Sequence, residues 1–259
     1  MSLQSKWVLI TGASAGIGAA CSYAFAREGA NLILWARRLE NLEPLAAELR
    51  ETYATHVHFA SVDVRNIQGI QDALQNLPSE ARQIDVLVNN AGLVIGLNKA
   101  HETPPEDVDT MIDTNVKGVL NTLREIVPGM VKRNAGQVIN ISSISGLQSY
   151  PGGSVYCGSK HAVHAITNSL RMDLVDTPIR VATVSPGLVD TEFSLVRFKG
   201  DAEKAMQVYK GLEPLIGNDI AEAVVFIATR PPHIQVADMI IFPTAQAAAT
   251  LVHRHTVEG

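Results

Sequence analysis

The sequence predicts a doubly wound α/β fold, in which about seven parallel strands are covered by helices on both faces. Three observations lead to this fold class. Short aliphatic segments alternate with longer segments of helical period, most of the aliphatic segments are continuously apolar, and the first of them runs into a glycine-rich turn. Continuously apolar strands are typical of a sheet buried on both faces. The alternation of strand and helix implies right-handed crossovers, and therefore a parallel sheet.

The individual elements follow from this alternation. We expect strands at residues 7–11, 31–36, 56–62, 86–89, 137–141, 180–184 and 239–242. We expect helices at residues 17–28, 42–53, 67–77, 108–131, 155–175 and 220–229. Since no repeat or Pro/Gly-rich linker interrupts the pattern, a single domain over residues 1–259 is the better interpretation of the length.

Two segments fall outside the regular pattern. The helical period breaks down over residues 188–213, which follow Pro186-Gly187 and mix charged with apolar side chains. This segment is either a disordered loop or a lid that closes over a ligand, and we favour the lid. Residues 243–259 form a C-terminal tail that could cross to a neighbouring subunit.

Composition and charge exclude several classes of protein. The net charge of −5 gives no support to nucleic-acid binding, which needs a basic face. No stretch approaches the roughly 20 apolar residues of a membrane span. Two cysteines, Cys21 and Cys157, are too few for a disulfide framework and suit a reducing compartment. We therefore expect a soluble, cytoplasmic protein without a membrane or nucleic-acid partner.

A glycine-rich loop follows the first strand and opens the first helix, with the sequence Thr-Gly-Ala-Ser-Ala-Gly-Ile-Gly at residues 11–18. Gly12 permits the tight turn, Gly16 allows the backbone to approach a pyrophosphate, and Gly18 allows close packing of helix and strand. The N–H groups at the start of the helix then face the phosphates. At this junction the loop indicates a dinucleotide site in a Rossmann-type fold, with Ser14 and Ile17 among its contacts.

The end of the second strand indicates which dinucleotide is bound. A carboxylate at this position would accept hydrogen bonds from the adenosine ribose and repel a 2′-phosphate. The sequence has Arg37 and Arg38 instead. Two guanidinium groups can form charge-assisted hydrogen bonds with a phosphate, which favours NADP(H) over NAD(H). The alternative is a solvated pair of charges at the start of the next helix.

Candidate catalytic residues follow the fifth strand. Tyr156 and Lys160 are four residues apart, so a helix places them on one face. A nearby ammonium lowers the pKa of a phenol, which makes the tyrosine useful for acid–base work. Ser142 and Ser143 end the fifth strand, and the carboxyl ends of parallel strands converge on one edge of the sheet. A serine and a tyrosine hydroxyl could there contact one carbonyl oxygen.

These motifs together resemble the short-chain dehydrogenase/reductase family over essentially the whole chain. The matching residues are Thr-Gly-x-x-x-Gly-x-Gly at 11–18, Asp63, Asn-Asn-Ala-Gly at 89–92, Asn115, Ser143, Tyr-x-x-x-Lys at 156–160 and Pro-Gly at 186–187. The resemblance implies a catalytic tetrad of Asn115, Ser143, Tyr156 and Lys160. Ser143 is preferred to Ser142 because it lies 13 residues before Tyr156, the spacing expected in this family.

The resemblance also implies a role for each of these residues. Tyr156 exchanges a proton with the substrate oxygen, and Ser143 orients and polarises that oxygen. Lys160 holds the nicotinamide ribose and lowers the pKa of the tyrosine, while Asn115 supports a water that links Lys160 to solvent. Further cofactor contacts are implied at Asp63, Val64, Asn90, Ala91, Gly92, Pro186, Gly187, Val189 and Thr191.

A narrower resemblance concerns the substrate. Residues 89–96, 111–118, 191–193 and 196–201 are similar to the NADP-dependent 3-hydroxy acid dehydrogenases, also called serine 3-dehydrogenases. It implies oxidation of the 3-hydroxyl of serine, allo-threonine or 3-hydroxy acids such as 3-hydroxypropionate. One alternative is a broad NADPH-dependent carbonyl reductase of small ketones and aldehydes. The other is a non-enzymatic NADP-sensing scaffold, which would normally have lost part of the tetrad.

The substrate contacts follow from the charge of a hydroxy acid. Arg197 could pair with the carboxylate in a bidentate way, and Lys199 could add charge. Alternatively both are solvent-facing. Gln148 precedes Tyr156 and could line the pocket.

Histidines and assembly complete the predictions. His161 and His164 are interpreted as packing residues of their helix, and no metal is expected because the nicotinamide supplies the hydride. Helices 108–131 and 155–175 carry more apolar residues than one sheet contact needs. In the family that the sequence resembles, the equivalent helices usually form the dimer core, so we expect a homo-oligomer, either dimer or tetramer.

Overall fold

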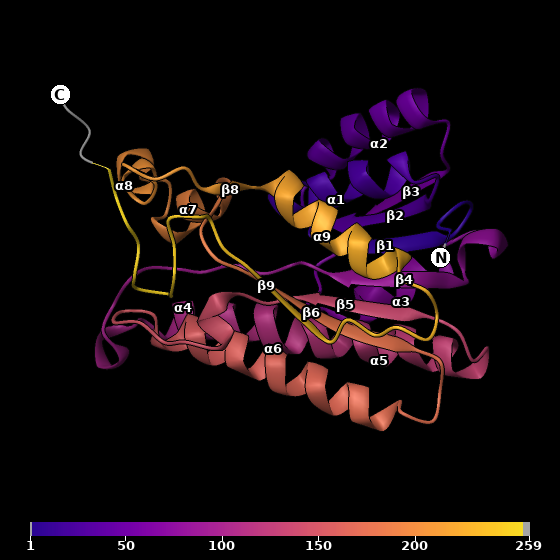
Figure 1. Ribbon diagram of the computed structural model, residues 1–259. Coiled ribbons are helices and arrows are strands. Elements are labelled where there is room, and N and C mark those ends of the chain that lie inside the picture. The colour runs from indigo at the N-terminus through magenta and orange to yellow at the C-terminus, as the bar shows by residue number, and fades with distance from the viewer. Residues whose placement is uncertain (1, 256–259) are drawn as a thin grey trace.

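The computed structural model describes residues 2–255 and has one seven-stranded parallel sheet (Figure 1). Its strands are β1 (Trp7–Thr11), β2 (Asn31–Ala36), β3 (Val57–Ser61), β4 (Ile84–Asn89), β5 (Gln137–Ile141), β6 (Arg180–Pro186) and β9 (Asp238–Ile241). They lie in the order β3-β2-β1-β4-β5-β6-β9, and each neighbouring pair is parallel. The prediction of a doubly wound parallel sheet is therefore confirmed.

Helices cover both faces of the sheet, in two layers that Figure 1 shows above and below the strands. One layer holds α1 (Gly16–Arg27), α2 (Leu39–Tyr53) and α9 (Gly217–Thr229), and the other holds α3 (Ile67–Gln75), α5 (Gly118–Lys132) and α6 (Ser154–Asp173). Successive residues of β1 serve the two layers in turn, since Val8 and Ile10 pack in one core and Leu9 in the other. This double burial is why the strands are continuously apolar.

The strand order reverses at β1, which pairs with β2 on one side and with β4 on the other. In an open α/β sheet, ligands bind beyond the carboxyl ends of the strands at such a point. The loops that follow β1 and β4 are the glycine loop and the segment from Asn90 to Gly92. The topology thus brings two predicted cofactor segments together.

The predicted helix at 108–131 has an irregularity that its periodicity did not reveal. The structure divides it into α4 (Pro105–Ile112), one π-helical turn (Asp113–Lys117) and α5. A π-turn inserts one extra residue into the helix and is frequent at functional sites. Here the inserted turn carries Asn115, which is buried.

The 188–213 segment is folded rather than disordered. It contains β7 (Val189–Asp190), α7 (Glu192–Arg197) and α8 (Ala202–Gln207), and β7 pairs with β8 (Leu215–Ile216) in a small second sheet. Figure 1 shows α7 and α8 beyond one end of the main sheet.

The tail packs against this segment of its own chain. The guanidinium of Arg254 donates to the carbonyls of Val208 and Lys210, and the N–H of His255 donates to the carbonyl of Gly211. Residues 256–259, which belong to the predicted tail, lie outside the described residues. Within residues 2–255, no helix combines the length and the apolar character that a membrane crossing requires.

Candidate active site

A cavity of about 730 Å³ lies at the carboxyl ends of the strands. Its walls come from the glycine loop, the loops after β2 to β6, the start of α6, and α7. Most predicted site residues line it, namely Gly12, Ser14, Gly16, Ile17, Arg37, Arg38, Asp63, Val64, Asn90, Ala91, Gly92, Ser143, Tyr156, Lys160, Pro186, Gly187, Val189, Thr191 and Arg197. Gly18 and Asn115 lie behind the wall, and Gln148 lies outside it.

The glycine loop has the geometry that its three glycines predict. Gly12 and Gly16 have φ angles of +66° and +55°, in the left-handed region that glycine tolerates best. A Cβ at Gly18 would lie 2.2 Å from the carbonyl oxygen of Gly12, so helix α1 can pack this closely only because the side chain is absent. The start of α1 has no side-chain cap, which leaves its N–H groups facing the cavity for an anion.

Asn90 and Thr11 fasten the loop after β4 to the glycine loop. The Asn90 amide donates to the carbonyls of Thr11 and Gly12, at 3.0 and 3.2 Å. The Thr11 hydroxyl accepts hydrogen bonds from the N–H groups of Asn90 and Ala91, both at 3.0 Å. Asn90 therefore holds the cofactor loop in place as well as lining the cavity.

Arg37 and Arg38 line the cavity at the end formed by the glycine loop. Arg38 lies 2.9 Å from the Glu192 carboxylate and donates to the Ser14 hydroxyl at 3.4 Å. Asp63 is paired with Arg65, whose hydrogen bond lowers the pKa of the carboxyl. Arg37 and Arg38 thus line the cavity together with Asp63, whose charge is already compensated by Arg65.

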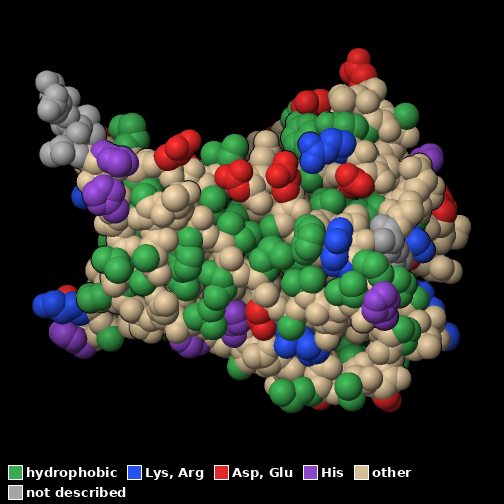
Figure 2. Space-filling view, in the orientation of Figure 1, with side chains coloured by type: hydrophobic (Ala, Val, Ile, Leu, Met, Phe, Trp, Pro, Cys, Tyr) green, Lys and Arg blue, Asp and Glu red, His purple; other side chains and the backbone are tan. Residues whose placement is uncertain are grey.

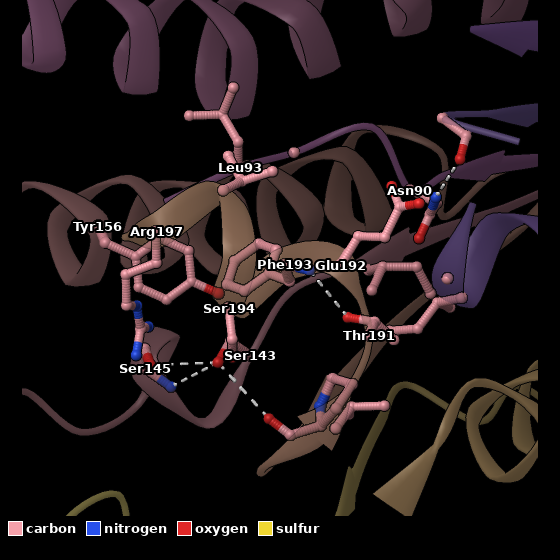
Figure 3. A pocket seen from close by; sticks show the side chains of 18 of the residues that line it. Asn90, Leu93, Ser143, Ser145, Tyr156, Thr191, Glu192, Phe193, Ser194 and Arg197 are labelled. Carbon is pink, nitrogen blue, oxygen red and sulfur yellow. Dashed lines mark hydrogen bonds between the residues drawn. The ribbon is translucent and has the colours of Figure 1, made fainter. Parts of the chain in front are cut away.

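Ser143 and Tyr156 meet at the opposite end of the cavity, on the same side as Arg197 in Figure 3. Ser143 lies two residues beyond Ile141, the last residue of β5, and its hydroxyl accepts a hydrogen bond from the N–H of Ser145 at 3.1 Å. Tyr156 is buried, and its ring meets Phe193 edge-on with centroids 5.7 Å apart. Two hydroxyl groups can therefore contact one substrate oxygen at this end.

Lys160 lies one turn along α6 from Tyr156, on the same helix face. Its ammonium donates to the carbonyl of Ile141 at 2.9 Å and lies 6.0 Å from the centre of the tyrosine ring. Asn115 lies next to Lys160, because both side chains approach the same point beside Gly92. A Cβ atom built on Gly92 would be 3.3 Å from the Asn115 Oδ1 and 3.5 Å from the Lys160 Nζ. The Asn115 amide itself is fixed by hydrogen bonds with the backbone of Leu93 and with Ser159.

Burial shifts the pKa values of this pair in opposite directions. Burial raises the pKa of Tyr156, and the hydrogen bond with Ser143 and the charge of Arg197 oppose that rise. Burial lowers the pKa of Lys160 to about 8. For the tyrosine, desolvation outweighs the two opposing effects, and the Lys160 ammonium, which is directed to the Ile141 carbonyl, is not among the groups that lower the tyrosine pKa here. A lowering of the tyrosine pKa by Lys160 stays a prediction.

Two predicted substrate contacts are wrong. The Lys199 ammonium is held by the Asp107 carboxylate at 2.9 and 3.1 Å and does not line the cavity. The Gln148 side chain is exposed, and its oxygen accepts a hydrogen bond from the N–H of Ala249 in the tail at 2.8 Å. Both residues bind other parts of the chain, which the sequence does not show.

Arg197 does line the cavity, with its guanidinium close to two aromatic rings. Its guanidinium carbon is 6.0 Å from the ring centres of both Tyr150 and Phe193. One of its nitrogens donates to the Tyr150 hydroxyl at 3.1 Å. Aromatic faces stabilise a guanidinium and orient it, so the charge stands in a fixed position.

Several residues of the cavity wall were not among the predicted site residues. Phe193 packs on Tyr156, and Ser145 fixes the catalytic serine candidate. Gln246 reaches the cavity from the tail, where its oxygen accepts a hydrogen bond from the N–H of Leu188 at 2.8 Å. An ST-turn pattern could have suggested Ser145, but the contacts of Phe193 and Gln246 depend on tertiary structure.

Of the two predicted packing histidines of α6, His164 packs within the fold, whereas His161 is exposed and bonds to its own helix. His164 is buried and bonded to the Ser185 hydroxyl at 3.0 Å, and His161 is bonded to the Cys157 carbonyl at 2.8 Å. Within residues 2–255, no group of three or more His, Cys, Asp or Glu side chains is arranged to hold a metal ion.

A dinucleotide-type glycine loop opposite a serine, a tyrosine and a lysine defines a class of protein, the oxidoreductases built on a doubly wound sheet. Comparison with known proteins then gives the family. The sequence model of the short chain dehydrogenase family matches residues 6–201, and the chain belongs to this family. The predicted resemblance is confirmed, and the chain is an enzyme.

Individual relatives are similar over almost their whole length. The NADP-dependent 3-hydroxy acid dehydrogenase of Schizosaccharomyces pombe is 44% identical over 97% of this chain and 98% of its own. Sulfoacetaldehyde reductase 2 of Chromohalobacter salexigens is 41% identical over 94% and 96%. Among solved structures, the closed form of serine dehydrogenase complexed with NADP+ has 43% identity and a TM-score of 0.90, covering 96% of this chain and all of the other.

Proposed function

We propose that this chain is an NADP(H)-dependent oxidoreductase of small 3-hydroxy acids, with serine, allo-threonine and 3-hydroxypropionate as candidate substrates. The hydride would pass between the nicotinamide and the carbon that bears the 3-hydroxyl or 3-oxo group. One observation carries the proposal: the hydroxyls of Ser143 and Tyr156 and the guanidinium of Arg197 line one end of a cavity whose other end is a glycine loop.

The residues at the glycine-loop end fit NADP(H). The uncapped start of α1 offers N–H groups to the pyrophosphate. Arg37, Arg38 and Ser14 would hold the 2′-phosphate, and Asp63 with Val64 would lie beside the adenine. The two closely related dehydrogenases described above are named with NADP, in agreement with the cofactor predicted from the two arginines.

The tyrosine and the serine would handle the proton. The nicotinamide, when bound, accepts a hydride from the alcohol carbon or donates one to the carbonyl carbon. Tyr156 takes the hydroxyl proton during oxidation and returns a proton to the same oxygen during reduction. Ser143 donates a hydrogen bond to that oxygen, a role for which Ser145 fixes its hydroxyl.

Lys160 and Asn115 would support the proton transfer from behind. With a pKa of about 8, the buried amine of Lys160 can gain or lose a proton near neutral pH. Asn115 lies beside it in the π-turn, where it would support a water leading to solvent. The proposed relay runs from the substrate oxygen through Tyr156 and Lys160 to this water.

Arg197 would bind the acid group of the substrate. It is a cation at the substrate end of the cavity wall, fixed by Tyr150 and Phe193. A guanidinium pairs well with a planar carboxylate. The relatives agree with an anionic substrate, since a hydroxy acid, serine and sulfoacetaldehyde all carry an acid group beside the reacting carbon chain.

A broad reductase of small neutral ketones is the competing proposal, and substrate turnover separates the two. We expect NADPH absorbance to show faster turnover of serine and 3-hydroxypropionate than of propanol or propanone. Arg197→Ala should raise the Michaelis constant for the hydroxy acids about tenfold or more, because charge-assisted hydrogen bonds contribute about 1.5–3 kcal/mol. Neutral substrates should be unaffected.

Lys199→Ala is the matched control, because its charge belongs to the same segment but is held by Asp107. It should leave the Michaelis constants unchanged. If Arg197→Ala also leaves the constant for hydroxy acids unchanged, Arg197 does not bind the carboxylate and the broad reductase is favoured.

Location and assembly remain predictions. On the face in Figure 2, Lys and Arg side chains are scattered among acidic ones, in keeping with the expected lack of a nucleic-acid partner. We propose a cytoplasmic homo-oligomer, either dimer or tetramer. Size exclusion coupled to light scattering would decide the subunit number.

A further inference from the structure

An ion pair at the cavity joins the start of α2 to the start of α7. Arg38 precedes α2, Glu192 is the first residue of α7, and their side chains lie 2.9 Å apart. Both line the cavity, and Arg38 also donates to Ser14 in the glycine loop. Figure 3 shows Glu192 beside Thr191, on the side of the pocket where Asn90 lies.

We propose that Glu192 is a specificity-determining residue, which competes with the 2′-phosphate of the cofactor for Arg38. The proposal rests on the proposed use of NADP(H) and adds a residue that opposes it. The same nitrogen of Arg38 faces the Glu192 carboxylate and the Ser14 hydroxyl, two positions at the predicted phosphate site. A phosphate that takes this nitrogen must approach or displace the carboxylate.

Charge decides which anion Arg38 prefers. A phosphate monoester carries nearly two negative charges at neutral pH, against one for a carboxylate. The Arg38 and Glu192 side chains are 45% and 53% exposed, so their ion pair is weakly held and can be displaced. Repulsion between phosphate and carboxylate then reduces the affinity for NADP(H) but not for NAD(H), which has no 2′-phosphate.

Glu192 also lies between two residues that contact the glycine loop and the catalytic end of the cavity. Thr191 caps α7 by accepting a hydrogen bond from the N–H of Phe193 at 3.3 Å, and it packs over Gly16. Phe193 meets the ring of Tyr156. Glu192, which pairs with Arg38, and Phe193, which contacts Tyr156, are thus adjacent residues in the first turn of α7. Release of Glu192 by a 2′-phosphate would free this turn from α2.

The test measures binding of cofactor fragments by calorimetry, with no turnover involved. Glu192→Gln should tighten the binding of 2′,5′-ADP and of NADP+ about two- to fivefold, the range expected for one exposed charge contact. The binding of NAD+ and 5′-AMP should not change. Glu203→Gln removes the same charge from the exposed α8 and serves as the control, with no effect on either ligand pair.

A double-substitution cycle shows whether the effect passes through the arginine. In an Arg38→Ala background, Glu192→Gln should no longer tighten 2′,5′-ADP binding. Unchanged or weaker binding of 2′,5′-ADP to Glu192→Gln in the natural background would overturn the proposal, since Glu192 would then be neutral or would orient Arg38 for the phosphate. A persistent gain in the Arg38→Ala background would also overturn it.

The proposed cofactor fails by a different result. If the unaltered chain binds 2′,5′-ADP no more tightly than 5′-AMP, the 2′-phosphate has no site and the choice of NADP(H) is wrong. If the unaltered chain prefers 2′,5′-ADP and Glu192→Gln leaves that preference the same, the cofactor choice stands and the role of Glu192 does not.

Discussion

The two ends of the cavity are built in different ways. At the cofactor end, backbone geometry sets the shape: Gly18 has no room for a side chain, and Asn90 bonds to backbone carbonyls of the glycine loop. At the substrate end, side chains from distant segments set it. Arg197 bonds to Tyr150, 47 residues away, and Gln246 bonds to Leu188, 58 residues away.

This difference explains which residues a short motif can reveal. Backbone geometry requires particular residue types at fixed spacing, so the cofactor end has a local signature. Contacts between distant side chains have none, and the substrate end is therefore where the predictions from Lys199 and Gln148 were wrong. Substitutions at the two ends should accordingly separate chemistry from cofactor binding.

The largest effect is expected at the substrate end. Tyr156→Phe removes the hydroxyl that we propose exchanges the proton and keeps the ring that packs on Phe193. We expect kcat to fall by about 10²–10⁴, the usual contribution of a general acid or base. Stopped-flow absorbance of NADPH measures it.

Binding of NADPH, followed by its fluorescence, is the control for this variant. It should stay within about twofold of the unaltered chain, because the cofactor end is intact. Turnover that survives in Tyr156→Phe would show that another group transfers the proton.

The second effect concerns the cofactor end alone. Arg37→Ala combined with Arg38→Ala should reduce the preference for NADP+ over NAD+ by about a hundredfold or more, since each charge-assisted hydrogen bond contributes about 1.5–3 kcal/mol. The ratio of kcat/KM for the two cofactors measures this. The kcat at saturating NAD+ should change little, and an unaltered cofactor ratio would refute the phosphate role of the two arginines.

The third effect tests whether backbone geometry shapes the glycine loop. In Gly18→Ala the new methyl group would lie 2.2 Å from the Gly12 carbonyl, so α1 must move. We expect a loss of about 1–3 kcal/mol in the free energy of unfolding, as for other overpacked sites, together with weaker NADPH binding. Urea denaturation and fluorescence measure the two.

Gly158→Ala supplies the comparison, because a Cβ at Gly158 in α6 would meet nothing within 4 Å. Alanine is the better helix former, so this variant should gain about 0.5–1 kcal/mol. A Gly18→Ala variant that is as stable as Gly158→Ala would show that the helix and strand do not need the close approach.

The fold itself was predictable because the whole chain repeats one pattern. Strands at 7–11, 31–36 and 137–141 were located correctly from runs of aliphatic residues, since burial on both faces demands them. The π-turn at Asn115 could not be predicted, because its residues have ordinary helical periodicity and the extra residue is stabilised by tertiary contacts. The same holds for the pKa shifts, which depend on burial rather than on residue spacing.

The smallest effect is a pH dependence of stability at the buried lysine. Burial lowers the pKa of Lys160 from 10.5 to about 8, so the folded state is penalised for carrying the charge. Below about pH 8 both folded and unfolded chains are protonated and the whole penalty applies. As the pH rises above 8, the folded chain loses the proton first and the penalty is relieved.

The variant without this titration is Lys160→Met, which fills the site with an uncharged chain of similar length. Between about pH 8 and 9.5, the unaltered chain should gain up to about 1.4 kcal/mol of stability per pH unit relative to the variant. Urea denaturation at steps of half a pH unit measures the difference in the free energy of unfolding between the two chains. The titration of groups that both chains share cancels in this difference. A difference that is flat over this range would mean that Lys160 keeps its proton in the fold, and the proposed relay through a readily titrated amine would have to be abandoned.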